Sequence, residues 1–359
     1  MLKVYHKYIL KNYLISFIQV TLIFLSLIFV LNIFEEINFF KDEEVGFLFP
    51  LILTFLNSPS ILYDIFPFIF LISVQMFFIK IIDRDELTAF KKFGLSNFKI
   101  LSIIFVSVLF LSLIISYFFY NFSAQFKFSY LDIKNKFTKD DKYLAVITDN
   151  GLWIKDETEK NINLINALKI ENNFLKNVSI TSYDKNFNFK SHIQAEEIDV
   201  SKFLWRIERA NVSEKNKVAH KDENISILTN FNYEIINNLY SDLKSLTVGE
   251  LYDLKDDYNS LGYSTVEISA HLQKIFSFPI LTILLALLGG VFMFRLKKDS
   301  NKYFTITFGI LISVIVYYIN YFFYTIGVNE RMPLTPSIWL PQLIMFIIFS
   351  FSLVTVNEK

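Results

Sequence analysis

The charged residues that could do chemistry gather in one short segment, "DRDELTAFKKFGLSNFK" (83–99), between two strongly apolar stretches. Its acids come first and its lysines follow, which is the order that a helix macrodipole favours. Asp83 can act as the N-cap, Glu86 follows at capping-box spacing, and Gly94 can end the helix. The segment therefore predicts a helix over 83–93.

Two interpretations of this helix fit the residues. In one, it lies along the membrane surface, anchored by aromatic side chains, and Glu86 is only a cap. In the other, the helix docks into a partner protein and Glu86 is a contact. Its narrow apolar stripe consists of Leu87, Ala89, Phe90 and Phe93.

No catalytic motif accompanies this segment. The sequence has no P-loop, no H-E-x-x-H and no G-x-S-x-G, and its four histidines do not have the spacing of metal ligands. There are no cysteines, and the net charge is zero, so neither a thiolate metal site nor a nucleic-acid partner is indicated. We expect no catalytic residue, metal or cofactor here, and a partner that hydrolyses ATP is a natural energy source.

The elements that position the segment are membrane helices. Hydrophobic residues make up 53% of the 359 residues, and about 20 apolar residues suffice to cross a bilayer. Six spans are predicted from runs that carry almost no charge. These runs are Asn12–Phe34, Val45–Ile79, Ile100–Phe126, Ile275–Phe294, Tyr303–Asn329 and Met332–Asn357.

The second run is too long for one crossing, because it would measure about 50 Å as a helix. We interpret 45–56 as a short interfacial or re-entrant helix and 60–82 as the second span, divided at "NSPS" (57–60). One long kinked helix is the alternative. Asp64 is the one acid in this run, and we expect it at the outer end of the span.

Lysine and arginine set the predicted orientation. They gather before the first span, in the 80–99 loop and in the 295–302 loop, whereas the 35–44 and 329–333 flanks are acidic or nearly neutral. By the positive-inside rule, both termini and the 83–99 segment face the cytoplasm. The 122–270 segment then lies outside.

The outer segment has the texture of a β-domain. Short runs rich in Ile, Val, Phe, Tyr and Thr alternate with polar residues, as in "VSITSYDKNFNF", and "TDNG" (148–151) is a turn signal. They predict an antiparallel sandwich or jelly roll. After residue 247 the pattern becomes helical, over Val248–Leu261 and Ser264–Phe276, with a break at "LGYS".

In this order, the motifs resemble the LptF/LptG (YjgP/YjgQ) permease family, the membrane subunits of the lipopolysaccharide exporter. The resemblance covers nearly the whole chain, and the linker and the C-terminal loop look closer to the LptG branch. Lys92 before "FG" departs from the family pattern. The resemblance rests on the stretches "IFPFIFLISVQMFFIKIIDRDELTAFKKFGLS", "NGLWIKDE", "IQAEEIDV…LWRIERANV", "LGYSTVEISAHLQKIFSFP" and "RMPLTPSIWLP".

The resemblance implies an α-helical membrane protein with six transmembrane helices (3+3) and an inserted periplasmic β-jellyroll. It implies transmembrane helices 1–3 in 1–121, the jellyroll in 122–246, a helical linker in 247–276 and helices 4–6 in 277–359. The chain would lie in the bacterial inner membrane and move lipopolysaccharide. Implied partners are an LptF-like sister, a cytoplasmic ATPase dimer that binds the ATP, a single-span LptC-like jellyroll protein and a periplasmic bridge.

It further implies that 83–93 is the coupling helix and that the first and fifth spans, about 12–34 and 303–328, form gates around a substrate cavity. Some members carry a base near the outer end of the first span, where this chain has Asn32, Glu35 and Glu36. The coupling residues are then Arg84, Asp85, Glu86, Phe90, Lys91 and Gly94. The cavity residues are Asn32, Phe34, Glu35, Tyr317, Asn320 and Tyr321.

Two alternatives remain open from the sequence. The chain could be the LptF-type sister subunit, or a non-transporting envelope sensor or assembly protein that has no associated ATPase.

Overall fold

The computed structural model describes residues 4–41, 45–135, 137, 152–157, 161–171, 173–214, 220–233, 236, 242–260, 264–294 and 302–357. The chain divides into two compact units. One unit comprises Met1–Tyr130 and Val266–Lys359, and the other comprises Leu131–Thr265. The "TDNG" turn signal lies outside the described residues.

The first unit is a bundle in which six helical segments are long and apolar enough to cross a membrane, as predicted. They begin and end close to the charges that bound each apolar run. The segments are α1 (Val4–Phe39), α2 (Leu48–Asp83), the composite third span (97–134), α8 (Val266–Met293), α9 (Lys302–Val328) and α10 (Leu334–Asn357).

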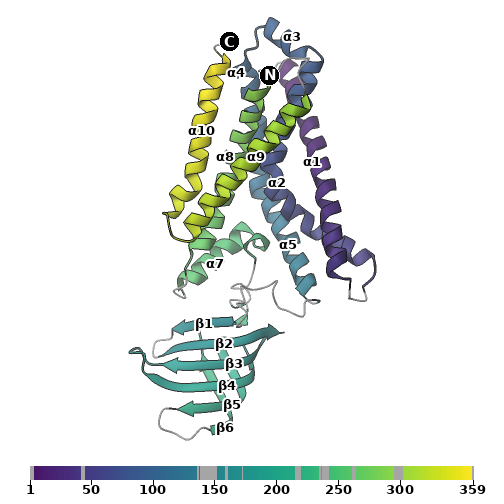
Figure 1. Ribbon diagram of the computed structural model, residues 1–359. Coiled ribbons are helices and arrows are strands. Elements are labelled where there is room, and N and C mark those ends of the chain that lie inside the picture. Colours follow the sequence, from purple (N-terminus) through teal and green to yellow (C-terminus); the bar gives the residue numbers. More distant parts are fainter. Residues whose placement is uncertain are drawn as a thin grey trace. The chain divides into compact units, whose positions relative to one another are not determined.

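Helices α2 and α8 form the centre of the bundle (Figure 1). In their most apolar windows 72% and 78% of residues are buried, against 17% in α1 and 11% in α9. Gly290 of α8 allows a close approach, because a Cβ there would lie 2.7 Å from Cδ2 of Leu101. The apolar side chains of α1 and α9 are therefore left to face lipid or another protein.

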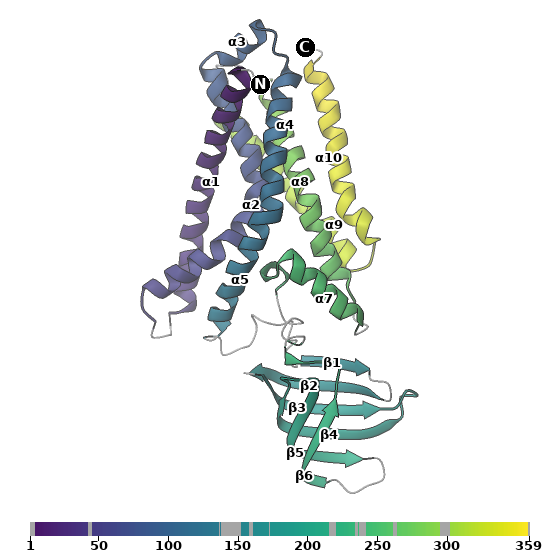
Figure 2. The ribbon, with the colours of Figure 1, turned by 180° about the vertical axis from the view of Figure 1, so that it is seen from behind.

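The second span is one continuous helix of 36 residues, so the predicted division at "NSPS" is wrong and the long helix is correct. Pro59 and Pro67 lie inside it, where each lacks an N–H to donate. Membrane helices tolerate such prolines because neighbouring helices and hydroxyl side chains satisfy the freed carbonyls. Ser58 and Thr54 also donate back to carbonyls one turn earlier, at 2.6 and 2.8 Å. The helix curves along the bundle (Figure 2).

The third span contains a π-helical segment, Ile115–Phe119, between α4 (Asn97–Ile114) and α5 (Tyr120–Asn135). The wider turn lets Ser116 reach α8, where its hydroxyl donates to the carbonyl oxygen of Ile275 at 3.0 Å. A π segment inside a helix often marks a functional position.

The second unit is built on a six-stranded antiparallel sheet, in the order β1-β2-β3-β4-β5-β6. Alternation of buried and exposed residues, as in β3, explains why these segments are strands. The strands are β1 (Leu152–Glu157), β2 (Ile162–Glu171), β3 (Phe174–Tyr183), β4 (Phe189–Asp199), β5 (Leu204–Glu214) and β6 (His220–Leu228). The inserted β-domain is confirmed, although the described strands form one twisted meander rather than the two sheets of a sandwich (Figure 2).

One face of this sheet carries the core of the second unit. Trp205 is fully buried there, and its indole Nε1 donates to the carbonyl oxygen of Phe231 at 2.8 Å. This hydrogen bond satisfies the one polar atom of the largest buried side chain. Every strand from β1 to β5 contributes buried apolar residues to the same cluster.

Helix α7 (Val248–Ser260) follows the sheet in sequence. Its start is a capping box: the Glu250 carboxylate accepts from the backbone N–H of Thr247 at 2.7 Å, and Thr247 Oγ1 accepts from the N–H of Glu250 at 3.4 Å. The second predicted linker helix, Ser264–Phe276, is the start of α8, so the expected boundary at residue 276 falls inside a continuous helix.

Candidate partner-docking and transport sites

The loop helix α3 is Glu86–Lys92, shorter than the predicted 83–93. Asp83 is not its N-cap, because α2 continues through Asp83. The N-cap is Asp85, which has a φ of 57° and forms no side-chain capping bond. Aspartate is one of the few non-glycine residues that adopt this left-handed conformation readily. The turn at Asp85 thus separates α3 from α2.

Gly94 ends α3 as predicted. Its φ is 80°, and its N–H donates to the carbonyl of Lys91 at 3.0 Å. The next N–H, of Leu95, donates to the carbonyl of Phe90 at 3.0 Å. This pair of bonds is a Schellman motif, and its left-handed position favours glycine. The helix end is therefore encoded locally.

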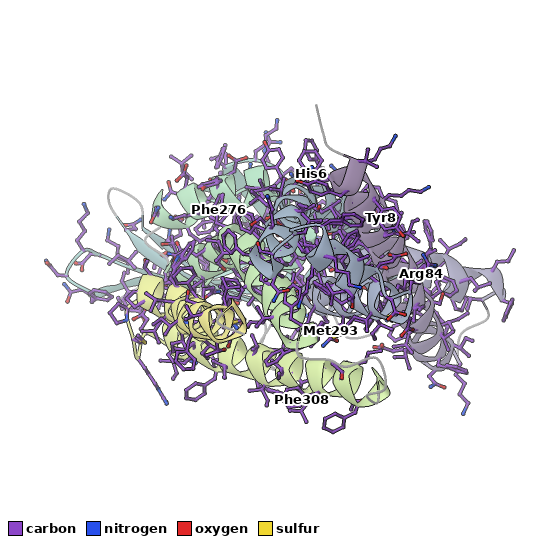
Figure 3. All side chains as sticks on the ribbon, turned by 90° about the horizontal axis from the view of Figure 1, so that it is seen from above. His6, Tyr8, Arg84, Phe276, Met293 and Phe308 are labelled. Atoms are coloured by element: carbon purple, nitrogen blue, oxygen red, sulfur yellow. The ribbon has the colours of Figure 1, made fainter. Side chains whose placement is uncertain are left out.

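Glu86 does not cap α3. Its Oε1 accepts a hydrogen bond from the Tyr8 hydroxyl of α1 at 2.7 Å and lies 3.8 Å from Nη1 of Arg84. Its Oε2 is buried, with no hydrogen-bond partner among the described residues. The carboxylate is therefore directed toward α1 (Figure 3 labels Tyr8 and Arg84).

The apolar stripe of α3 is divided between interior and surface. Leu87 is buried and Phe90 is half-buried, with its ring against Tyr8 at 6.2 Å between centroids. Phe93, by contrast, is 85% exposed. Arg84, Asp85, Thr88, Lys91, Lys92 and Gly94 are also exposed. One face of α3 thus packs on the bundle, and the other is open for a partner.

A polar cluster lies between α1, α2 and α5. Asn57 Nδ2 donates to Oδ1 of Asn32 at 3.2 Å, and Asn57 Oδ1 accepts from Nζ of Lys127 at 2.9 Å. Glu36 is fully buried and accepts from the Tyr130 hydroxyl at 2.8 Å. The Lys127 ammonium lies 4.7 Å from the centre of the Tyr130 ring. We call these five residues the outer polar cluster.

The predicted cavity residues lie on two separate helices. On α1, Asn32 is buried in the outer polar cluster, while Phe34 and Glu35 are exposed. On α9, Tyr317 and Tyr321 are exposed and their rings stack at 6.5 Å. Asn320 Oδ1 accepts from Nε2 of Gln342 in α10 at 3.3 Å. Phe34, Glu35, Tyr317 and Tyr321 are thus open at the surface of this chain, whereas Asn32 and Asn320 are bonded to neighbouring helices.

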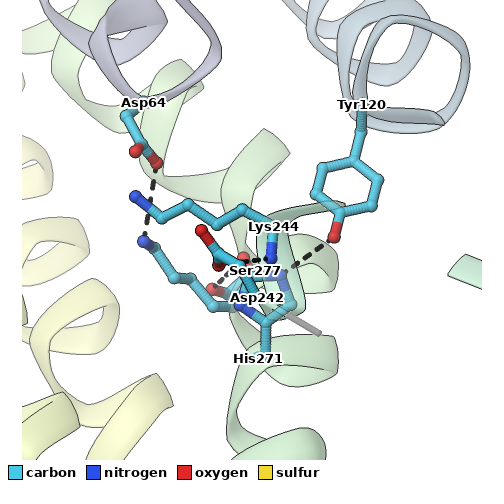
Figure 4. A network of polar contacts seen from close by, with 7 residues as sticks. Asp64, Tyr120, Asp242, Lys244, His271 and Ser277 are labelled. Carbon is cyan, nitrogen blue, oxygen red and sulfur yellow. Dashed lines mark hydrogen bonds and ion pairs between the residues drawn. The ribbon is translucent and has the colours of Figure 1, made fainter. Parts of the chain in front are cut away.

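Asp64 is paired with a base rather than buried alone. Its Oδ1 lies 3.7 Å from Nζ of Lys274 in α8, and both side chains are partly exposed. Close to the same part of α8, the Tyr120 hydroxyl and Nε2 of His271 are 2.9 Å apart (Figure 4). The Asp64 ion pair thus joins α2 to α8, while the Ser116 and Tyr120 contacts join the third span to α8.

Sequence reasoning missed several of these residues. Tyr8 and Glu86 are 78 positions apart, and no local pattern joins them. Lys127 was available as a signal, because it is the charge that ends the third apolar run. Glu36 was named only as one of the residues at the outer end of the first span, without its contact to Tyr130. Phe93 was assigned to the apolar stripe and not to the exposed surface.

The fold defines the class of protein: a helical membrane protein of six spans, with an antiparallel β-domain inserted between the third and the fourth. The chain belongs to the lipopolysaccharide export system permease LptF/LptG family, whose model matches residues 7–355. It is therefore a membrane subunit of an ABC transporter for lipopolysaccharide, and this family is non-catalytic. No curated protein matches the chain.

Proposed function

We propose that the chain is the LptG-type subunit of this exporter and that α3 docks into the ATPase. The observation that carries the proposal is the open face of α3, where Phe93 stands among exposed charged residues. An aromatic anchor within a polar rim is the usual composition of an interface hot spot. In this proposal Arg84, Asp85, Lys91 and Gly94 also face the ATPase, while Glu86 and Phe90 hold α3 against α1.

The proposed sidedness follows from charge. The described N-terminus and C-terminus lie at the same end of the bundle as α3 (Figure 1), and the sequence segments at that end are rich in lysine and arginine. The positive-inside rule then assigns this end to the cytoplasm. It follows that the β-domain is periplasmic and that the protein is a multi-pass protein of the bacterial inner membrane.

Two further partners fit the exposed surfaces. Helices α1 and α9 leave most of their apolar residues uncovered, which suits an LptF-like sister and lipid. In the described sheet β1 and β6 are the outer strands. Strand addition to such an edge is a general mode of recognition, and we propose it for the single-span LptC-like partner and the periplasmic bridge.

The proposed transport step uses these surfaces in order. Closure of the ATPase dimer on ATP moves α3, and the space between α1 and α9 narrows. Exposed Phe34, Glu35, Tyr317 and Tyr321 would meet the lipid, with Asn32 and Asn320 behind them. Lipopolysaccharide is then driven toward the β-domain, where its acyl chains need apolar contact, because water exposure costs about 0.8 kcal/mol per CH₂.

Phe93→Ala tests the docking surface. We expect it to reduce recovery of the ATPase with the permease by about tenfold or more, the usual effect of losing a hot-spot aromatic residue. The matched control is Phe98→Ala, which removes another exposed phenylalanine, 54% exposed, from α4. Recovery of the ATPase is measured after purification from native membranes, with thermal stability measured on the same samples.

Full recovery with Phe93→Ala would refute the assigned surface. If no nucleotide-binding subunit accompanies the wild-type chain, the docking role of α3 fails as a whole. The type of sister subunit that co-purifies distinguishes the LptG-type role from the LptF-type role, because the proposed exporter contains one subunit of each type. A sister of LptG type would assign the LptF-type role to this chain.

A further inference from the structure

The inner end of α1 is joined to α3 by a side-chain contact of two parts. The Tyr8 hydroxyl donates to Oε1 of Glu86 at 2.7 Å, and the Tyr8 ring meets Phe90 edge-on at 6.2 Å. A hydroxyl-to-carboxylate hydrogen bond of this length is charge-assisted and stronger than a neutral one. Arg84 lies 3.8 Å from the same oxygen and holds the carboxylate from the other side. Glu86 is thus fixed between α1 and the turn that precedes α3.

A second link joins α1 to α2. Lys80 donates from Nζ to Oγ of Ser16 at 3.1 Å and to Oε1 of Gln19 at 2.5 Å. Tyr8 and Ser16 are eight residues apart, or about 12 Å along a helix. The inner part of α1 is therefore held at two levels, by α3 at Tyr8 and by α2 farther along.

The far part of α1 belongs to the outer polar cluster. Asn32 accepts from Asn57 of α2, and Glu36 accepts from Tyr130 of α5. Between the two ends, α1 exposes Leu22, Ile23 and Leu27, each more than half accessible. Because α1 is one continuous helix from Val4 to Phe39, a displacement at its inner end has a rigid path toward the outer polar cluster.

We propose that the Tyr8–Glu86 hydrogen bond transmits the movement of α3 to α1, so that Tyr8 is a positioning residue for lipid transport. This inference rests on the proposed docking of the ATPase onto α3. The open face of α3 contains neither Tyr8 nor the carboxylate that it binds. Loss of the Tyr8 hydroxyl is therefore expected to spare ATPase binding and to uncouple ATP hydrolysis from movement of α1.

The link itself is measured in the chain alone, in lipid nanodiscs. The sequence has no native cysteine, so Lys7→Cys and Lys92→Cys place two spin labels at exposed positions of α1 and α3. Tyr8→Phe keeps the ring and removes the donor, and it is expected to broaden the distance distribution between the labels. The matched control is Tyr5→Phe on the same helix, where the ring stacks on His6 at 4.3 Å.

The consequence for transport is measured in the complete exporter in proteoliposomes. We expect Tyr8→Phe to keep its rate of ATP hydrolysis and to lower the lipopolysaccharide moved per ATP by about threefold or more. Glu86→Gln retains an oxygen acceptor for the hydroxyl, so it should preserve more of the coupling than Tyr8→Phe does. Tyr5→Phe is expected to behave as the wild type.

Two results would overturn the inference while leaving the docking role of α3 intact. One is a distance distribution in Tyr8→Phe as narrow as in the wild type. The other is an unchanged ratio of lipid to ATP in a Tyr8→Phe exporter that has assembled normally. If the wild-type chain recruits no ATPase, the docking role and this inference fail together.

Discussion

Gln75 of α2 donates a hydrogen bond from its side-chain Nε2 to the backbone carbonyl oxygen of Thr305 in α9, at 3.3 Å. Gln75 is almost completely buried, at 1% exposure. The contact is possible because Gly309, one turn farther along α9, has no side chain where the Gln75 amide lies. The largely exposed helix α9 is thus held to the centre of the bundle by the Gln75 side chain, for which Gly309 leaves room.

Gly309→Ala should disturb this contact. The new Cβ would fall on the Gln75 amide, so the amide must move and lose Thr305, at a cost of about 1–3 kcal/mol. We expect a lower thermal midpoint of the purified protein in detergent. The midpoint is measured by size-exclusion chromatography of samples heated to increasing temperatures. Gly249→Ala is the control, because nothing lies within 4 Å of its Cβ position in α7. Equal midpoints for the two variants would contradict the role of Gly309.

Trp205→Phe should destabilise the β-domain. The substitution removes the indole donor and leaves the buried carbonyl of Phe231 without that bond, which costs about 1–3 kcal/mol. Hydrogen–deuterium exchange of the whole chain should show faster exchange in β5 and unchanged exchange in α2. The control is Phe203→Leu, which changes a neighbouring aromatic residue that is 48% exposed, and it should leave exchange in β5 unchanged. Exchange in β5 as slow as in the wild type would contradict the prediction.

Asn57→Leu should break up the outer polar cluster. It removes the donor to Asn32 and one acceptor of Lys127 together, and loss of a hydrogen bond by a buried polar group costs about 1–3 kcal/mol. The thermal unfolding midpoint of the purified protein should therefore fall. Ser129→Ala, on the exposed side of α5, is the control. A midpoint for Asn57→Leu equal to that of the control would argue against a cooperative cluster.

The β-domain should lose stability in acid. The Ser201 hydroxyl and then its backbone N–H, which donate to Oδ1 of Asp199 at 2.6 and 2.9 Å, lower the pKa of this carboxyl below its usual value. A depressed folded-state pKa contributes stability above the unfolded value of about 3.9, and the contribution is lost as the pH falls through the folded pKa. The protection of amides near β4, taken as their exchange rate relative to the intrinsic rate at the same pH, should therefore fall below about pH 4, and Asp199→Asn should remove this dependence. A pH profile unchanged by Asp199→Asn would refute the assignment.

Much of the fold could be predicted because its signals are local. Charge-free runs gave the spans, alternation gave the strands, and Gly94 marked a helix end that the Schellman bonds explain. The predicted start of α3, at Asp83 rather than Glu86, was wrong because the local signal was ambiguous. Asp83 and Asp85 both suit an N-cap, and local spacing could not tell that α2 would continue to the first of them.

The remaining features depend on neighbours that the sequence does not display. Asn57 and Pro59 are turn formers in water, but inside the bundle the Asn57 side chain finds partners on α1 and α5, and membrane helices tolerate an internal proline, so α2 continues. The Tyr8–Glu86 contact joins residues from different helices, and no periodicity marks it. Phe93 could be placed in an apolar stripe, but its exposure is set by how α3 packs.

The π segment at Ile115–Phe119 sets which face of α5 meets the other helices. Its wider turn holds one residue more than an α-turn would, and each residue rotates a helix by about 100°. Without it, α5 would present a different face, and Lys127 and Tyr130 would turn away from Asn57 and Glu36. Deletion of one residue from Ile115–Phe119 is therefore expected to break up the outer polar cluster.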